Sequence, residues 1–301
     1  MQKISWVCVS GDVTESNGVL TYTPLQTNPG NPLATPIAGT IKSNCYFSSG
    51  KISYQLKLHG TTTYCRLKLG TNENAIYISI NEGQKAYSIN HWNSLKSLYS
   101  PIATAGEKKS LPTQTWISAE IEVDGSNIIL RISDVEVARI LANIQREAIS
   151  FDFIGPDKAE VRSVNIKPTR PKIFAVMEFT ERFNEIYSDV IIPVSKDFDL
   201  DVIRGDDIYN NGLVIQDITK SIIESALIIA DITPDNPNVY YEVGYAHASN
   251  KPVILLCDNE REKLPFDVTG FRTIFYKNSI AGKSEVESQL RKHLEALLPQ
   301  N

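Results

Sequence analysis

The chain has 301 residues, of which 42% are apolar, 22% charged and 9% aromatic. These values are typical of soluble globular proteins and exclude a disordered or fibrous chain. The length predicts two domains, since a domain has roughly 150 residues. The net charge of -5 is unevenly shared: residues 1–168 carry 16 basic and 14 acidic side chains, whereas residues 169–301 carry 14 and 21. The acidic half has no basic stripe, which argues against nucleic acid as a partner.

The cysteine pattern predicts a protein of a reducing compartment. Cys8, Cys45, Cys65 and Cys257 are widely spaced, form no CxxC pair and have no histidine at metal-ligand spacing. We therefore expect free thiols and no metal site. The N-terminus lacks an apolar signal region, and the longest apolar runs, at 226–230 and 252–256, have the length of buried strands. These features predict a cytoplasmic protein without a membrane anchor.

Residues 1–167 are predicted to form an all-β sandwich. Apolar and polar residues alternate at 51–58, 63–69, 75–80, 116–123 and 128–132, and Asp124-Gly125 marks a hairpin turn. Trp6, Trp92 and Trp116 are expected in the core. The strand that begins at Trp116, the hairpin, and the strands at 135–140 and 160–166 together resemble the concanavalin-like jelly-roll modules. This resemblance implies an architecture and leaves the ligand open between a glycan, a phage component and a second copy of the chain.

The segment 167–172 contains two prolines and is the predicted domain boundary. Beyond it, continuous apolar strands at 172–177, 200–205, 227–232, 252–257 and 272–277 alternate with helical patterns at 181–197, 213–226, 239–250 and 283–298. Val214, Ile218 and Ile222 form the apolar face of the second helix. This alternation predicts an α/β flavodoxin-like domain over residues 172–301, with a five-stranded parallel sheet in the order 2-1-3-4-5.

The predicted strand order also places the ligand site. In open α/β sheets the ligand lies beyond the carboxyl ends of the strands, at the switch point between strands 1 and 3. The relevant loops follow Met177 and Asp231. Asn236 and Asn238 are equally good N-caps for the next helix, and Glu242 lies in its opening turns.

The residues around these loops resemble a known group of enzymes. ADITPDNPNVYYEVGYAHASNKPVILL (230–256), MEF (177–179) and IRGDDIY (203–209) are similar to the nucleoside 2-deoxyribosyltransferase superfamily and its TIR-like, NAD-cleaving bacterial relatives. The resemblance implies that Glu242 is catalytic and that Asp231 is the acid near the ribose or base. Relatives often have Met-Pro-Phe where this chain has Met-Glu-Phe. The implied substrate-binding residues are Glu178, Phe179, Arg204, Asp206, Asp207, Asn236, Asn238 and Tyr241.

Cleavage of an N-glycosidic bond passes through an oxocarbenium-like transition state, which a carboxylate such as Glu242 stabilises. Nicotinamide leaves NAD+ without protonation, whereas a purine or pyrimidine needs an acid, for which Asp231 and Asp235 are the candidates. We therefore expect an N-glycosidase, with NAD+ as a substrate rather than a cofactor. By analogy, the sandwich would be the sensor of an effector in antiviral defence.

Three alternatives remain at this stage. A nucleoside or deoxynucleotide N-glycosidase or 2-deoxyribosyltransferase would use the same carboxylates. A nucleotide-sensing module would bind at the same edge without catalysis. A phospho-receiver would use Asp231 and Lys277, which end strands 3 and 5. For the sandwich, an unknown ligand and self-association into a homo-oligomer are both open.

Overall fold

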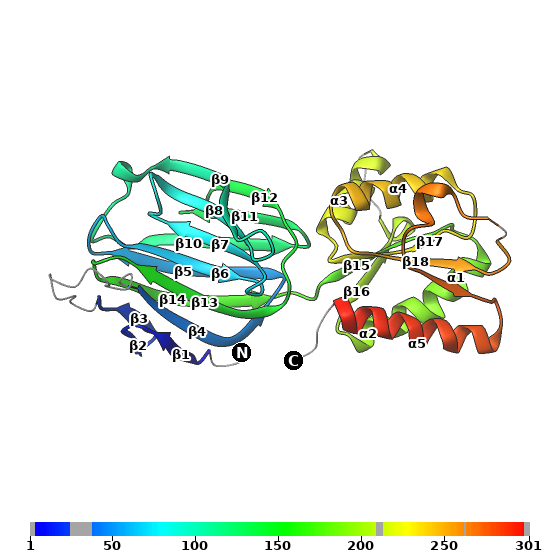
Figure 1. The fold of residues 1–301 in the computed structure, drawn as a ribbon, viewed down its shortest axis with the longest axis horizontal. Helices are drawn as coiled ribbons and strands as arrows, with labels where there is room; N and C mark the ends of the chain where they lie inside the picture. The colour runs from blue at the N-terminus through cyan, green and yellow to red at the C-terminus, as the bar shows by residue number, and fades with distance from the viewer. Residues whose placement is uncertain (1–3, 25–37, 209–212, 262, 298–301) are drawn as a thin grey trace. The chain divides into compact units, whose positions relative to one another are not determined.

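The computed structural model describes residues 4–24, 38–208, 213–261 and 263–297. The chain forms two compact units (Figure 1). The first comprises Met1–Val123 and Asn127–Thr169, and the second comprises Asp124–Ser126 and Arg170–Asn301. The sensor and catalytic roles assigned to the two segments stay predictions.

The first unit consists of two seven-stranded antiparallel sheets. Sheet A contains, in spatial order, β1 (Trp6–Ser10), β4 (Ala38–Phe47), β13 (Glu147–Ile154), β6 (Tyr64–Leu69), β7 (Asn74–Ile80), β8 (Lys85–Asn93) and β9 (Leu98–Glu107). Sheet B contains β12 (Val135–Leu141), β11 (Asn127–Ile132), β10 (Ile117–Asp124), β5 (Gly50–Leu58), β14 (Ala159–Pro168), β3 (Val19–Tyr22) and β2 (Val13–Ser16). A short 3-10 turn, Lys108–Ser110, follows β9.

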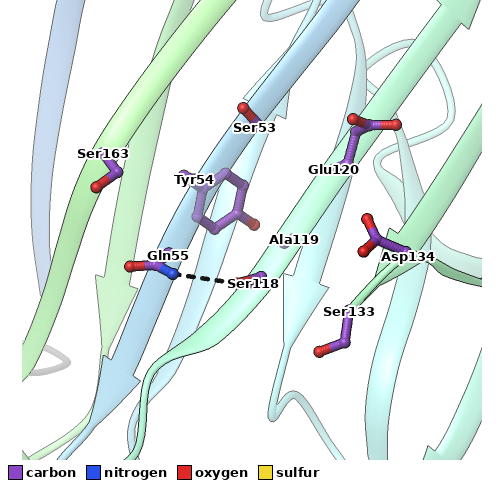
Figure 2. A pocket seen from close by; sticks show the side chains of 9 residues that line it. All are labelled: Ser53, Tyr54, Gln55, Ser118, Ala119, Glu120, Ser133, Asp134 and Ser163. Carbon is purple, nitrogen blue, oxygen red and sulfur yellow. Dashed lines mark hydrogen bonds between the residues drawn. The ribbon is translucent and has the colours of Figure 1, made fainter.

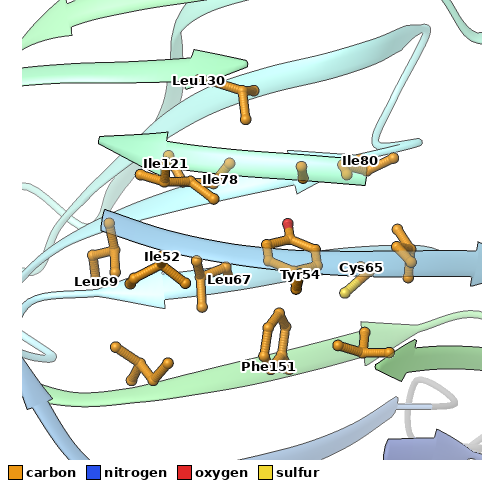
Figure 3. Packing of buried hydrophobic residues seen from close by; sticks show 14 of the residues in the cluster. Ile52, Tyr54, Cys65, Leu67, Leu69, Ile78, Ile80, Ile121, Leu130 and Phe151 are labelled. Carbon is orange, nitrogen blue, oxygen red and sulfur yellow. The ribbon is translucent and has the colours of Figure 1, made fainter. Parts of the chain in front are cut away.

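The core of this unit lies between the two sheets. Alternate residues of β5, β6 and β10 are buried, as the period of two requires. Figure 3 shows Tyr54 of β5 and Phe151 of β13 within this layer, and their rings meet edge to face with centroids 5.0 Å apart. Ile52 and Ile121 of sheet B pack in the same cluster as Leu67 of sheet A. The predicted β-sandwich is therefore confirmed.

The second unit contains a five-stranded parallel sheet in the order β16-β15-β17-β18-β19, which is the predicted order 2-1-3-4-5. The flavodoxin-like class itself stays a prediction. The strands of this sheet C are β15 (Lys172–Val176), β16 (Asp201–Arg204), β17 (Leu227–Asp231), β18 (Val253–Asp258) and β19 (Thr273–Tyr276). The helices are α1 (Glu181–Ile186), α2 (Ile192–Asp197), α3 (Val214–Glu224), α4 (Pro237–Ala248) and α5 (Ile280–Leu297), with 3-10 turns at Gly205–Asp207 and Phe266–Val268.

Helices cover both faces of sheet C. One apolar cluster joins the sheet to α1, α2 and α5, and another joins it to α3 and α4 (Figure 1). The predicted helix over 181–197 is continuous but contains a π-helical turn, Tyr187–Ile191, just before Pro193. Proline has no N–H for the helical ladder, and a widened turn accommodates that loss. In α3, Ile218 and Ile222 are buried as predicted, whereas Val214 is 75% exposed because it begins the helix.

All four cysteines are free, as predicted. Over the described ranges, no helix combines the length and the apolar character needed to cross a membrane. No group of three or more His, Cys, Asp or Glu side chains suited to a metal ion occurs within the same residues.

Candidate functional site

Asp231 ends β17 at the predicted edge of sheet C, but its carboxylate is closed off from solvent. The residue is 0% exposed, accepts hydrogen bonds from the backbone N–H of Thr233 at 2.9 Å and from its hydroxyl at 2.5 Å, and accepts a third from the Tyr276 hydroxyl at 2.7 Å. Burial raises the pKa of Asp231, although the bonds from Thr233 and Tyr276 oppose that rise. This geometry ties β17 to β19 and leaves no carboxylate oxygen for a ligand.

The helix that follows begins as one of the two predicted registers requires. Asn236 is the N-cap of α4 and accepts from the backbone N–H of Asn238 at 2.9 Å, with Pro237 at the first helical position. The side-chain amide of Asn236 donates to Glu178 at 2.9 Å. The loops after β15 and β17 are thus joined at the carboxyl edge of the sheet, as predicted.

Glu242 lies on α4 and is half-buried, and none of the described residues forms a hydrogen bond or ion pair with it. Burial raises its pKa to about 7. A carboxyl group that is half protonated near neutral pH can give or take a proton, so Glu242 is suited to act as a general acid or base. Phe179 and Tyr241 are 58% and 54% exposed.

Arg204 is occupied by its own neighbours. The residue is 6% exposed. Its guanidinium pairs with Asp206 through Nε at 2.6 Å and Nη2 at 2.5 Å, and donates from Nη1 to Asn184 at 2.8 Å. Asp207 in turn accepts from the backbone N–H of Arg204 at 3.0 Å and from the Tyr187 hydroxyl at 2.9 Å. The predicted substrate-binding arginine is therefore neutralised, and no other predicted residue supplies a cation for a phosphate.

A second set of functional groups, which the sequence did not indicate, crosses the outer face of sheet A. The strand register places one polar residue from each of the six strands β4, β13, β6, β7, β8 and β9 in a single row. Because their neighbours along each strand point into the core, these side chains lie on the opposite face. The row consists of Thr40, Asp152, Arg66, Ser79, Ser88 and Thr104.

Glu82, in the turn after β7, organises the middle of this row. It accepts from Arg66 through Nε at 3.0 Å and through Nη2, from the Tyr99 hydroxyl at 2.8 Å and from the Asn90 amide at 3.2 Å. Burial raises the pKa of Glu82, but the hydrogen bonds from Arg66 and Ser79 outweigh burial and hold that pKa below its usual value. The carboxylate is therefore ionised at neutral pH and fixes the side chains around it.

Three tyrosine rings surround Arg66. Its guanidinium carbon lies 5.0 Å from the ring centroid of Tyr64, 5.4 Å from that of Tyr77 and 4.6 Å from that of Tyr99. These distances fall within the range of cation–π contacts. We call Tyr64, Arg66, Tyr77, Glu82, Asn90 and Tyr99 the Arg66 cluster.

The Arg66 cluster keeps polar atoms that its own bonds do not use. The Asn90 amide nitrogen lies 2.9 Å from each of the Ser79 and Ser88 hydroxyls and 3.2 Å from Glu82, so its two hydrogens are shared among three acceptors, and the residue is only 3% exposed. Within the described part of the chain, Nη1 of Arg66 and the hydroxyls of Tyr64 and Tyr77 have no hydrogen-bond partner, and these three residues are only partly buried. Fixed donors, acceptors and aromatic surface thus lie together on one face.

Sheet B carries a pocket of about 260 Å³ on its own outer face (Figure 2). Gln55 of β5 donates to the Ser118 hydroxyl of β10 at 3.2 Å and accepts from Nε of Arg162 of β14 at 2.9 Å. The pocket is lined by Ser53, Tyr54, Gln55, Ser118, Ala119, Glu120, Ser133, Asp134 and Ser163.

Trp116 lies beside these residues and is not part of the core, contrary to the prediction. Its ring lies under the guanidinium of Arg162, 3.9 Å from the centroid, and under the ammonium of Lys57, 4.6 Å away. Trp116 precedes the first inward-pointing residue of β10, Ile117, so the alternation turns its side chain outward.

Comparison with protein-family models and with curated proteins finds no match. Among solved structures, a carbohydrate-binding module CBM66 from Bacillus subtilis is 10% identical, with 53% of this chain and 92% of that chain covered and a TM-score of 0.42. A β-1,3-1,4-glucanase (lichenase) from a mouse hindgut metagenome is 11% identical, with coverages of 53% and 90% and a TM-score of 0.42. A Bacillus subtilis protein of unknown function with a galectin-like fold is 13% identical, with coverages of 53% and 87% and a TM-score of 0.42.

These findings contradict the predicted nucleotide chemistry. Several of the similar structures bear the names of a carbohydrate-binding module, glycosidases or transglycosylases, and nothing among them indicates a TIR-like or deoxyribosyltransferase domain. The expectations of an NAD+ nucleosidase, a nucleoside N-glycosidase or deoxyribosyltransferase, a nucleotide sensor and an antiviral effector are therefore wrong. The side chains supply a physical reason, because Asp231 is sealed by Thr233 and Tyr276 and Arg204 is neutralised by Asp206.

Proposed function

We propose that the β-sandwich unit binds a saccharide on the Arg66 cluster. The observation that carries the proposal is a guanidinium held by both oxygens of Glu82 and enclosed by three tyrosine rings, Tyr64, Tyr77 and Tyr99, on one face of sheet A.

A saccharide matches this surface chemically. Its hydroxyl groups both donate and accept hydrogen bonds, and its C–H faces are apolar. Nη1 of Arg66 offers donors, and the hydroxyls of Tyr64 and Tyr77 each offer a donor and an acceptor. The tyrosine rings supply the amphipathic surface that suits a ligand with apolar and wet sides. Because Glu82 balances the charge of Arg66, the cluster does not select an anion.

The network also fixes these groups before a ligand arrives. Glu82 holds Arg66, Asn90 and Tyr99 through side-chain bonds of 2.8–3.2 Å together with the shorter Nη2 contact. The side chains of Arg66 and Glu82 are only 20% and 16% exposed. Side chains that are already ordered lose less rotamer freedom on binding, which favours affinity.

Affinity electrophoresis of the full chain tests this proposal. Native gels that contain soluble xylan, galactomannan, glycogen or a mixed-linkage β-glucan should include at least one that slows the wild-type chain. Tyr77→Ala should remove most of that retardation, because it deletes one ring and one free hydroxyl from the cluster. Tyr46→Ala is the matched control, since Tyr46 is 41% exposed on β4 of the same sheet and lies outside the cluster.

Two results would count against saccharide binding at this face. One is equal mobility of the wild-type chain in all four gels and in a gel without polysaccharide. The other is equal retardation of Tyr77→Ala and Tyr46→Ala.

A second candidate function, cleavage of a carbohydrate glycosidic bond, is favoured by Glu242. Its pKa of about 7, raised by burial, is typical of the general acid of a glycosidase. In this proposal Glu178 provides the second carboxylate, and the exposed rings of Phe179 and Tyr241 border the substrate.

Turnover of p-nitrophenyl glycosides of glucose, galactose, xylose and N-acetylglucosamine tests the second candidate. Glu242→Gln should lower turnover by about two orders of magnitude or more, and Glu285→Gln, on the exposed face of α5, should leave it unchanged. Equal rates for the two variants, or no turnover of any of the four by the wild-type chain, would refute catalysis by Glu242.

A further inference from the structure

The pocket on sheet B shares no residue with the Arg66 cluster, so it raises a separate question. We propose that this pocket is a second saccharide site, which takes one uncharged sugar residue by its hydroxyl edge.

One wall of the pocket comes from a β-bulge. β14 pairs with β5 through Arg162 opposite Gln55 and through Asn165 opposite Ser53. Between these pairs two residues of β14 face the single residue Tyr54, and the first of the two is Ser163. Such a bulge bends the strand and redirects a side chain, and it leaves a hollow in the pleated surface. Ser163 has a φ of 54°, which a residue with a side chain rarely adopts.

The opposite rim is a tight turn between β11 and β12. Ser133 and Asp134 have φ values of 48° and 66°, as a two-residue type I′ turn requires. Glycine and asparagine are favoured in such turns, so a serine here is an unusual choice. The backbone N–H of Ser133 donates to the carbonyl of Ser118 at 3.0 Å, which holds the turn over β10. Two serines with a left-handed backbone conformation, Ser133 and Ser163, thus lie at opposite rims of the pocket.

The hydroxyl groups of Ser53, Ser133 and Ser163 have no hydrogen-bond partner among the described residues. Each hydroxyl can both donate and accept. The same pocket contains Glu120 and Asp134, whose carboxylates only accept when ionised. A ligand that satisfies this set must donate several hydrogen bonds, and a polyhydroxylated ligand does so.

The charges and the shape of the pocket narrow the ligand class further. Glu120 is paired with Arg131 at 3.3 Å and with Lys51 at 3.7 Å, whereas Asp134 has no ion-pair partner among the described residues. The residues that line the pocket carry two carboxylates and no basic group, which disfavours an anionic sugar.

The Tyr54 ring packs on Phe151 within the core (Figure 3), so the pocket offers no ring for stacking. A volume of about 260 Å³ lies below the usual range for drug-sized ligands, which suits a single sugar residue.

Ligand-observed saturation-transfer NMR on the full chain tests the proposal. The probes are methyl β-D-glucopyranoside, methyl β-D-galactopyranoside, N-acetyl-D-glucosamine and the anionic D-glucuronate. At least one uncharged probe should give a transfer signal, and glucuronate should give none.

Ser53→Leu and Ser118→Leu, each combined with Tyr77→Ala so that the Arg66 cluster does not contribute to the signal, fill the pocket from a half-buried strand position and should weaken binding about tenfold or more. Ser16→Leu, on the exposed edge strand β2 of the same sheet, is the matched control and should bind like the wild type. Tyr77→Ala should also retain the signal, which separates this pocket from the Arg66 cluster.

The proposal is overturned if no uncharged probe binds, if glucuronate binds as well as they do, or if binding survives both Ser53→Leu and Ser118→Leu. A signal lost only in Tyr77→Ala would assign all saccharide binding to the Arg66 cluster and would also overturn it.

Discussion

Replacement of Glu82 by glutamine tests the electrostatic basis of the Arg66 cluster. Glutamine keeps the shape of the side chain but removes its charge. Its NH2 group also replaces one oxygen that accepted from Arg66, so that two hydrogen-bond donors face each other. Breaking one half of a buried ion pair costs about 3–5 kcal/mol. Because Arg66 and Glu82 are 20% and 16% exposed, solvent recovers part of this loss, and we expect a destabilisation of about 2–4 kcal/mol.

The assay for Glu82→Gln uses a property of the sequence. All three tryptophans, Trp6, Trp92 and Trp116, lie in the sandwich unit, so urea unfolding followed by tryptophan fluorescence reports on that unit. For a domain of this size the expected loss corresponds to a fall in Tm of roughly 5–15 °C. The control is Glu107→Gln, because Glu107 pairs with Lys85 at the surface, with side chains 55% and 43% exposed.

Glu107→Gln should cost less than about 1 kcal/mol, as surface pairs do. A loss no larger for Glu82→Gln than for Glu107→Gln would refute the reasoning. The effect should also depend on pH. The folded-state pKa of Glu82 lies below its usual value of 4.5, so its stabilisation is complete above that value and is lost as the pH falls through the folded pKa. Glu82→Gln should lack this acid dependence.

Two further predictions concern burial. The pKa of Glu242 is raised from 4.5 to about 7, so the folded state is favoured when this group is protonated, and stability should fall as the pH rises from about 4.5 to about 7 and level off above that pH. Urea unfolding followed by helical circular dichroism measures the free energy of unfolding of the α/β unit. Between about pH 5 and pH 8 this free energy should fall by about 2 kcal/mol more in the wild type than in Glu242→Gln, after allowance for solvent screening. Parallel pH profiles of the two proteins would contradict this. In a thiol assay on the folded chain, Cys8 and Cys45 should react within minutes whereas the buried Cys65 and Cys257 should react only on unfolding; four fast thiols would contradict the described packing.

The spacing of apolar residues along the sequence was sufficient to predict a β-sandwich in one half of the chain and a parallel sheet with helices in the other. Alternation in segments such as 51–58 reports which side chains point into a sandwich core, and continuous apolar runs such as 227–232 report strands that are covered on both faces. The parallel order 2-1-3-4-5 followed from the alternation of strands with helices. Each of these signals depends on residues that are close in sequence, and the tertiary contacts do not change the type of element that it predicts.

The state of each side chain at the predicted site depends on contacts that are distant in sequence. Asp231 follows a strand, as a ligand-binding acid would, but the hydroxyl that closes over it belongs to Tyr276 on another strand. The resemblance of residues 230–256 to an enzyme family therefore indicated a strand, a loop and a helix, and gave no measure of whether the acid was accessible. Asp206, which neutralises Arg204, lies only two residues away and could have been considered from the sequence.

The Arg66 cluster could not have been found from sequence motifs. Its members lie between Tyr64 and Tyr99 on four successive strands and in the turn after β7, and no two are arranged in a recognised pattern. Strand register alone brings Arg66 beside Ser79 and Ser79 beside Ser88. The bulge at Ser163 was equally hidden, because serine carries no sequence signal for a positive φ.

The most direct test of the central claim is a crystal structure of the full chain with a short oligosaccharide from the polysaccharide that slows it most in affinity electrophoresis. We expect a sugar residue against the rings of Tyr77 and Tyr99, with its hydroxyl groups bonded to Nη1 of Arg66 and to the Tyr77 hydroxyl. A saturated crystal in which the Arg66 cluster is empty while the oligosaccharide lies elsewhere on the chain would contradict it.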